Sequence, residues 1–306
     1  MIGLHRRPVT TSRRLGASAA LAVLLLASTT GCQARAKVFA GTAAWVDIYD
    51  WSPTWVTSRN PAARPPFTAA RIDRMADAGI QQLYIQTASP RLNDLVLDRA
   101  LLQSLIARAR SHGMTVMAWF TPTFADPGAD IARMQAAVDL GVDGLGVDIE
   151  VTTAVTDVAT RNQRVVDEVT WMRAVNPDLP IAAIVLEPVL LDVINTRYWP
   201  EFPWTGLAAQ VDAWMPMGYW TNRTLASGYR DGYRYTAENI DRLRDHVGDP
   251  NAAVHVVGGL SDTTTDADIN GFVRAATERG ALGGSLYDDM ISSTSQYDLL
   301  APLART

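Results

Sequence analysis

The sequence predicts a (β/α)8 TIM barrel that follows an export leader, and three observations predict this fold class. Eight short apolar segments recur between residue 40 and the C-terminus, each separated from the next by the length of one helix. The segments between them have helical periodicity, and several end in glycine. Residues 40–306 cover about 265 positions, close to the roughly 250 of a typical barrel.

The eight predicted strands are short and rich in β-branched and aromatic residues, as strands usually are. In chain order they are 43–48 (AAWVDI), 82–86 (QLYIQ), 115–120 (TVMAWF), 144–150 (GLGVDIE), 181–187 (IAAIVLE), 212–217 (DAWMPM), 252–257 (AAVHVV) and 283–288 (GGSLYD). No change in composition marks a second domain after residue 40.

The segments between these strands are predicted to be helices. Residues 68–79 begin with Thr68, a good N-cap, and end in Gly79. Residues 98–113 and 266–280 have an apolar face and end in Gly113 and Gly280. A doubly wound open sheet is the alternative, but it usually has a glycine-rich turn after its first strand. Here that turn is YDWSPTW (49–55), which contains no glycine.

Residues 1–31 are predicted to be a lipoprotein signal peptide. A positive segment contains Arg6, Arg7, Arg13 and Arg14, and an apolar run too short to span a bilayer follows it. The sequence TTGC then resembles a lipobox, which implies that Cys32 is lipidated. We therefore expect an exported protein that is anchored by lipid to the outer face of a bacterial cell membrane, with a tether at 32–39 and the barrel at 40–306.

Composition and charge exclude several classes of partner and cofactor. Residues 1–31 hold four arginines and no acid, so the remainder carries a net charge of −9 against −5 for the whole chain. Such an acidic body has no basic excess that would suggest nucleic acid as a partner. The chain has four histidines without an H-x-H pair, and it lacks a P-loop and a G-x-S-x-G motif. We expect no metal and no cofactor.

The strand predicted at 144–150 brings two acids to the end of the barrel where active sites lie. Residues in a barrel strand alternate between the interior and the helices. The apolar members of this strand, which suit the helix side, are Leu145, Val147 and Ile149. Gly144, Gly146, Asp148 and Glu150 then point inward, with Asp148 just below Glu150 near the C-terminal mouth.

Two neighbouring acids in a partly dry site raise the pKa of at least one of them. A Glu with a raised pKa is a suitable general acid for the oxygen of a leaving group. The alternative is structural: the acids could cap the next helix or pair with Arg161 or Arg164.

The segment DGLGVDIE resembles the D-G-x-D-x-D-x-E signature of strand four in family 18 glycoside hydrolases, the chitinase-like barrels. Asp143, Gly144, Asp148 and Glu150 fall on this pattern, and Gly146 replaces an acid.

Two other strands extend the resemblance. In MPMGYW, Met217 and Tyr219 match the family's M-x-Y-D, and Trp220 replaces the Asp. Tyr287 stands where the family's eighth strand ends in Trp.

The resemblance implies a catalytic role for three residues. Glu150 would be the proton donor, Asp148 would orient a substrate N-acetyl group that attacks the anomeric carbon, and Tyr219 would hydrogen-bond the same group. This substrate-assisted route differs from the scheme that uses two carboxylates.

A mechanism with two carboxylates stays open. The second acid would come from Asp47, Glu187, Asp262, Asp288 or Asp289, each at or after a predicted strand end. A separation from Glu150 of about 5–5.5 Å would indicate retention, and roughly 6.5–9.5 Å would indicate inversion.

Aromatic residues at predicted strand ends suit the apolar faces of sugar rings, and Tyr49 adds to them. We expect a substrate platform at Trp51 and Trp220, whereas core packing is the favoured alternative for Trp119 and Trp214. The full set of predicted substrate-binding residues is Asp47, Trp51, Gln86, Trp119, Glu187, Met217, Trp220, Tyr287 and Asp288.

The sequence thus favours a glycosidase that acts on a bacterial or environmental polysaccharide with Glu150 as general acid. The alternative is a non-catalytic, glycan-binding barrel of the cell envelope. Asp148 and Glu150 favour the enzyme, whereas Gly146 and Trp220 favour the binding protein.

Overall fold

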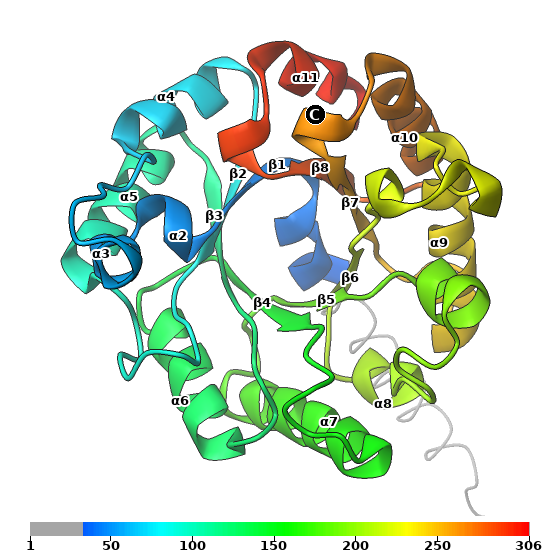
Figure 1. The fold of residues 1–306 in the computed structure, drawn as a ribbon, viewed down its shortest axis with the longest axis horizontal. Helices are drawn as coiled ribbons and strands as arrows, with labels where there is room; N and C mark the ends of the chain where they lie inside the picture. Colours follow the sequence, from blue (N-terminus) through cyan, green and yellow to red (C-terminus); the bar gives the residue numbers. More distant parts are fainter. Residues whose placement is uncertain (1–32, 306) are drawn as a thin grey trace, which may run out of the picture.

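The computed structural model describes residues 33–305, which form a ring of eight parallel strands surrounded by helices (Figure 1). The strands are β1 (Gly41–Val46), β2 (Gln82–Gln86), β3 (Thr115–Phe120), β4 (Gly144–Ile149), β5 (Ile181–Val185), β6 (Ala213–Pro216), β7 (His255–Leu260) and β8 (Gly283–Tyr287). Their order in the sheet is β6-β5-β4-β3-β2-β1-β8-β7. The predicted (β/α)8 barrel is confirmed.

The ring closes between β6 and β7. Two parallel bridges join these strands, Trp214 with Val254 and Met217 with Val257. The amide of Gly218 also donates a hydrogen bond to the carbonyl oxygen of Val257 at 2.8 Å. Because the sheet closes on itself, the open doubly wound alternative is wrong.

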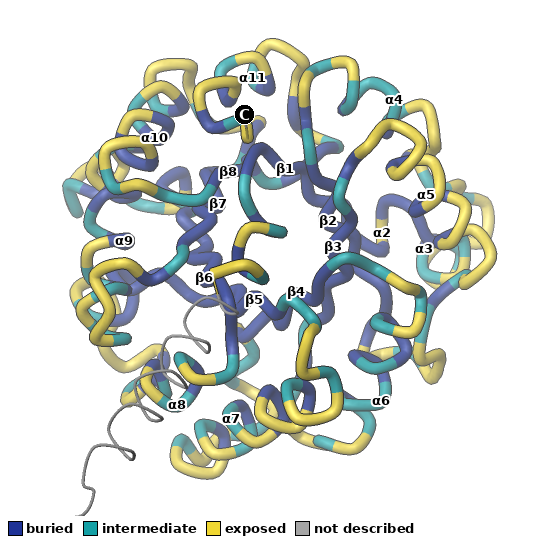
Figure 2. Tube along the Cα trace, turned by 180° about the vertical axis from the view of Figure 1, so that it is seen from behind, coloured by how far each residue is buried: buried dark blue, intermediate teal, exposed yellow. Residues whose placement is uncertain are grey.

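Helices cover the outside of the ring. Figure 2 shows their outer faces exposed and the strands inside them buried. None of the helices between residues 33 and 305 combines the length and the apolar character needed to cross a membrane. The helices are α2 (Ile48–Trp51), α3 (Pro53–Arg59), α4 (Ala69–Asp77), α5 (Arg99–Ser111), α6 (Pro127–Val138), α7 (Val158–Val175), α8 (Trp204–Ala208), α9 (Gly232–Val247), α10 (Asp266–Glu278) and α11 (Thr294–Leu299).

The predicted strand boundaries agree with the structure at β2 and β3 and shift elsewhere. β1 ends at Val46, because Asp47 starts a capping box and the short helix α2 follows at once. β7 begins at His255 and continues through Gly258 and Gly259 to Leu260. Glycines lower the predicted strand propensity, which is why the end of β7 was not foreseen.

Residues 33–39 are folded against the bottom of the barrel, so the prediction of a tether at these positions is wrong. Residues 33–36 are helical, and a 3₁₀ turn, η1 (Lys37–Phe39), follows. The Phe39 side chain is fully buried, and its carbonyl oxygen lies 2.9 Å from Nδ1 of His255, the first residue of β7. Arg35 pairs with Asp212 at 2.8 Å. The predicted leader and Cys32 lie outside the described residues.

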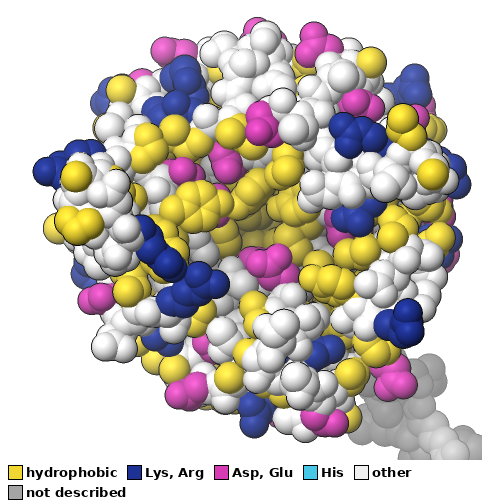
Figure 3. Space-filling model, in the orientation of Figure 1, with side chains coloured by type: hydrophobic (Ala, Val, Ile, Leu, Met, Phe, Trp, Pro, Cys, Tyr) yellow, Lys and Arg dark blue, Asp and Glu magenta, His cyan; other side chains and the backbone are white. Residues whose placement is uncertain are grey.

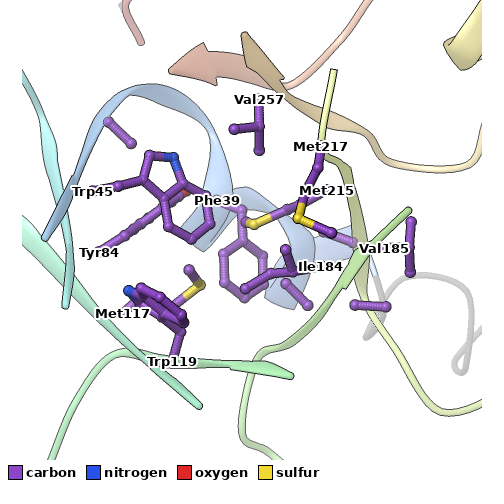
Figure 4. Close-up of a cluster of buried hydrophobic side chains, with 14 of the residues drawn as sticks. Phe39, Trp45, Tyr84, Met117, Trp119, Ile184, Val185, Met215, Met217 and Val257 are labelled. Atoms are coloured by element: carbon purple, nitrogen blue, oxygen red, sulfur yellow. The ribbon is translucent and has the colours of Figure 1, made fainter. Parts of the chain in front are cut away.

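Figure 4 shows the side chains that fill the interior of the barrel, with Phe39 among them. Most of the labelled strand residues follow the alternation expected of barrel strands, whereas Val185, next to the inward Ile184, has the opposite phase. The register between neighbouring strands determines which side chains lie at the same height in the barrel. Trp45 is paired with Tyr84, and Asp148 is paired with Ile184. The residues of β4 that point into the barrel are therefore the predicted ones, and Asp148 is among them.

Candidate active site

A pocket of about 290 Å³ opens where the strands end at the C-terminal mouth. Figure 3 shows it as a hollow over the centre of the barrel, with acidic side chains beside it. No Lys, Arg or His is among the described residues that line it. Nine lining residues are named above from the sequence, and they are Asp47, Tyr49, Gln86, Trp119, Asp148, Glu150, Met217, Tyr219 and Tyr287.

Four further lining residues were not foreseen: Trp45, Thr121, Ile184 and Val257. All four have the inward phase, since Trp45 precedes Asp47 by two positions and Thr121 follows Trp119 by two. The signal that could have found them is the same alternation that identified Asp148 and Glu150.

Asp148 lies at the floor of the pocket and is 5% exposed. The hydroxyl of Thr121 donates a hydrogen bond to Oδ2 of Asp148 at 2.7 Å. The other carboxyl oxygen, Oδ1, is buried without a partner among residues 33–305. Burial, followed by the charge of Glu150, raises the pKa of Asp148 well above its usual range, and the Thr121 hydrogen bond opposes this shift.

Glu150 follows β4 directly and is exposed at the rim of the pocket. Its carboxyl group makes no hydrogen bond or ion pair with any other residue in the described part of the chain, so it is free to contact a ligand. Partial desolvation inside the mouth raises its pKa. A carboxyl group with these properties can donate a proton.

The structural alternative for these two acids is wrong. Arg161 donates hydrogen bonds to the carbonyl oxygens of Thr152 and Val155 at 2.9 Å each, and its guanidinium lies over Trp199. Arg164 donates to the carbonyl oxygen of Phe124 at 2.7 Å. Both arginines therefore stabilise loops beside the pocket and leave its acids unpaired.

Asp47, directly after β1, forms a second acidic position in the pocket and is 1% exposed. The hydroxyl of Tyr287 donates to Oδ2 of Asp47 at 2.7 Å, and the hydroxyl of Tyr49 lies 3.1 Å from that of Tyr287. Burial is the main cause that raises the pKa of Asp47 to about 6, with smaller contributions from Asp288 and Glu150. Asp47 is therefore largely ionised at neutral pH.

The remaining pocket residues supply apolar walls and polar edges. The rings of Tyr219 and Tyr287 lie 5.6 Å apart, and burial raises the pKa of both hydroxyls well above the usual range, so both stay protonated. Oε1 of Gln86 accepts from the amide of Ile48 at 3.2 Å. Trp119 is both a wall of the pocket and a core residue, since it is 5% exposed.

At Gly146, where family 18 barrels carry an acid, a larger side chain would displace apolar neighbours. A Cβ atom there would lie 2.9 Å from Cδ1 of Ile184, 3.1 Å from Cε of Met117 and 3.2 Å from Cβ of Trp119. Apolar side chains thus fill the space below Asp148, and Thr121 takes the role of its polar neighbour.

The substrate platforms expected at Trp51 and Trp220 are wrong, because both side chains are completely buried. Trp51 lies in α2, and its Nε1 donates to the carbonyl oxygen of Gln86 at 2.9 Å. Trp220 has the outward phase relative to Met217 and Tyr219, and it packs against Phe272 of α10.

Glu187 and Asp288 also lie outside the pocket, which corrects their prediction as substrate-binding residues. Both have the outward phase, because Ile184 and Tyr287 point inward. Glu187 accepts from the amide of Tyr219 at 3.2 Å and pairs with Arg223 at 3.4 Å. Asp288 caps the turn η6 (Asp289–Ile291) and accepts from two of its amides.

The last two candidates for a second carboxylate are structural or remote. Asp289 is fully buried and pairs with Arg71 at 2.5 Å and Arg74 at 3.2 Å. Asp262 is exposed and does not line the pocket.

One set of side chains among residues 33–305 has the spacing of metal ligands. Asp47, Asp50 and Asp288 place one carboxylate oxygen each within 4.8 Å of the others. All three are buried, and burial raises the pKa of Asp50 to about 7.

No protein-family model matches the chain, and no curated protein matches it either. Solved structures do match. A GH18 chitinase from Cycas revoluta in complex with (GlcNAc)3 has a TM-score of 0.61 and 12% identity, over 86% of this chain and 99% of that chain.

Two bacterial proteins give the same result. The spore cortex-lytic enzyme SleL of Bacillus cereus has a TM-score of 0.59 and 9% identity over 87% of this chain and 74% of that chain. A chitinase from Bacteroides thetaiotaomicron has a TM-score of 0.58 and 11% identity over 87% of this chain and 96% of that chain. At these identities the likeness shows the fold alone, a (β/α)8 barrel similar to those of the GH18 chitinases, as the sequence predicts.

Proposed function

We propose that this protein is a glycoside hydrolase that acts on a polysaccharide, with Glu150 as the general acid. The observation that carries the proposal is an unpaired carboxyl group with a raised pKa at the rim of a pocket at the C-terminal mouth. Asp148 lies below it, and tyrosine and tryptophan side chains form the walls, which suit sugar rings.

Structural neighbours support a carbohydrate as the substrate. The Cycas revoluta chitinase was solved in complex with (GlcNAc)3, and SleL is described as a spore cortex-lytic enzyme. The absence of a basic side chain from the described lining favours a neutral glycan over one that carries many negative charges.

Asp148 and Tyr219 are proposed to hold the sugar next to Glu150. Asp148 has one carboxyl oxygen without a partner in the described residues, and no hydrogen bond there involves the hydroxyl of Tyr219. The buried oxygen of Asp148 would gain stability when a ligand supplies the missing hydrogen bond.

A lipid anchor at Cys32 is part of the proposal for the location of the protein. The signal at residues 1–31 supports export and attachment to the outer face of the cell membrane. Replacing Cys32 with Ser should move the protein from the membrane fraction to the medium. Continued sedimentation of this variant with membranes would contradict the anchor.

A glycan-binding barrel without catalysis is the second candidate. Gly146 and Trp220, which replace two acids of the family pattern, favour it. The presence of both Asp148 and Glu150 in one pocket favours the enzyme instead.

Hydrolysis of a panel of polysaccharides by the wild type and by Glu150→Gln distinguishes the two candidates. For an enzyme, we expect reducing ends from the wild type and a loss of about 10²–10⁴-fold in turnover for the variant. Glu201→Gln is the matched control, because Glu201 is exposed and lies outside this pocket. Binding of a glycan without turnover by the wild type would favour the binding protein.

A further inference from the structure

Tyr49 is the one aromatic side chain of the described pocket lining that is exposed, at 47%. Its neighbours in α2, Ile48, Asp50 and Trp51, are all buried. The other rings of the lining are buried or half-buried. Tyr49 therefore presents its ring to solvent at the rim of the pocket, on the side of the barrel that β1 forms.

Hydrogen bonds hold the Tyr49 ring in place. The hydroxyl of Tyr287 donates to Oδ2 of the buried Asp47 at 2.7 Å, so the hydroxyl of Tyr49 is the donor in its 3.1 Å contact with Tyr287. The backbone of Tyr49 is held in α2, which begins directly after Asp47. A side chain that is fixed at both ends loses little conformational freedom when a ligand binds to it.

The pocket holds only a short segment of a polysaccharide. Its volume of about 290 Å³ lies at the lower end of the range for ligand sites, which is roughly 300–1,000 Å³. The sugar that Asp148 and Tyr219 are proposed to hold occupies the floor, so the next unit of the chain must lie at the rim. Tyr49 and Glu150 are the two exposed members of the described lining, and of these only Tyr49 offers an aromatic face.

We propose that Tyr49 is the platform for the glycan unit next to the one held at Glu150, and that Asp47 is a positioning residue that fixes this platform through Tyr287. The inference rests on the proposed function, because it takes the substrate to be a glycan. The Tyr49 ring packs against the C–H groups on one face of that sugar, while the hydroxyls at the edge of the sugar stay in water. The substrate therefore has at least two linked units, and a single sugar does not reach the platform.

Binding of oligosaccharides of increasing length tests the platform. The probes are oligosaccharides of one to six units, cut from the polysaccharide that the panel described above identifies. In the inactive parent Glu150→Gln, the dissociation constant should fall about tenfold at the length that first reaches Tyr49. Adding Tyr49→Ala should remove this step and leave the affinity for the shortest bound oligosaccharide unchanged. Calorimetry measures the constants.

Hydrolysis provides a second measurement. With Glu150 intact, Tyr49→Ala should raise KM for the polysaccharide about tenfold with little change in kcat, because the platform binds substrate and transition state equally. Tyr198→Ala is the matched control, since Tyr198 is also exposed and lies outside the pocket. Its KM and kcat should equal those of the wild type.

The role of Asp47 is tested on the same length dependence. Asp47→Ala removes the acceptor of the Tyr287 hydroxyl and should weaken the binding of long oligosaccharides about threefold or more. Asp47→Asn keeps an acceptor oxygen and should bind nearly as tightly as the parent. Combined with Tyr49→Ala, Asp47→Ala should cause no further loss, because the two changes affect one platform. A general structural defect would instead weaken binding at every length, and circular dichroism checks that each variant folds.

The outcomes distinguish this inference from the function on which it rests. A Tyr49→Ala variant that binds every oligosaccharide as tightly as the parent, or a loss that is equal at all lengths, would overturn the platform and leave the glycosidase intact. Undiminished binding of long oligosaccharides by Asp47→Ala would overturn the role of Asp47. A wild type that binds with this length dependence but releases no reducing ends would support the platform and contradict the hydrolase. Failure of the wild type to bind or hydrolyse any polysaccharide would overturn both.

Discussion

The hydroxyl of Thr121, just after β3, donates a hydrogen bond of 2.7 Å to the carboxylate of Asp148 on β4. This bond lowers the pKa of Asp148 against the larger effect of burial. Thr121 and not an acid at position 146 is therefore the polar neighbour of Asp148, because apolar side chains fill the space around Gly146.

Loss of this hydrogen bond should impair catalysis. Thr121→Val keeps the shape of the side chain but removes the donor, so the pKa of Asp148 should rise further. We expect kcat/KM to fall roughly tenfold, which corresponds to about 1.4 kcal/mol, on the best polysaccharide substrate. Thr121→Ser retains the hydroxyl and should keep most of the activity. Equal activity of the two variants would show that the bond has no role in turnover.

An acid introduced at position 146 should destabilise the fold. Gly146→Asp would force a side chain against Ile184, Met117 and Trp119 and would bury a carboxyl group without a partner. We expect a loss of roughly 3–5 kcal/mol in the free energy of unfolding, measured by urea denaturation. Gly146→Ala, which adds only the methyl group, should cost about 1–2 kcal/mol. A stable Gly146→Asp variant would mean that the interior relaxes around this site.

Phe39 should contribute strongly to stability, although it precedes the first strand. Its ring lies against Gly144 at the start of β4 and is fully buried. Phe39→Ala should lower the free energy of unfolding by about 3–5 kcal/mol because it leaves a cavity at the barrel bottom. Lys37→Ala, at an exposed neighbouring position, should change it by less than about 0.5 kcal/mol. Similar melting temperatures for both variants would contradict the packing described above.

Glu168 should make the protein less stable as the pH rises. It is 1% exposed in α7, and neither carboxyl oxygen has a partner among residues 33–305. Burial is the main cause that raises its pKa to about 9. Between about pH 4.5 and 9 the folded state holds this proton and the unfolded state does not, so the free energy of unfolding falls as the pH increases.

Glu168→Gln removes this dependence. It should raise the free energy of unfolding by up to about 3 kcal/mol at pH 7 and by almost nothing at pH 4, where both states of the wild type are protonated. Urea denaturation at the two pH values measures the difference. A gain that is equal at both pH values would contradict the shifted ionisation.

The strands and the acids of β4 could be predicted from sequence because a period of two fixes which side chains enter a barrel. The same rule, applied to β5, β6 and β8, excludes Glu187, Trp220 and Asp288, which have the opposite phase. Their residue types suggested a functional role, but their positions in the strand alternation direct these side chains away from the barrel interior. Trp45 and Thr121 have the correct phase and line the pocket.

The remaining differences depend on contacts between distant segments. Trp51 is buried because α2 begins directly after β1, and its indole nitrogen donates to the carbonyl oxygen of Gln86 at the end of β2. The seven residues before Ala40 pack under the barrel because an interior that contains Gly144 leaves space for the ring of Phe39. Neither relationship has a local signal in the sequence.

The position of Arg35 and Phe39 determines the orientation that the barrel would have on a membrane. Both contact the starting ends of the strands, so residue 33, the first of the described residues, lies on the side of the barrel opposite the pocket. If Cys32 carries a lipid, no linker would lie between the lipid-bearing residue and the folded residues that begin at position 33. A lipid at Cys32, as proposed above, would then place the barrel on the membrane with its pocket on the far side.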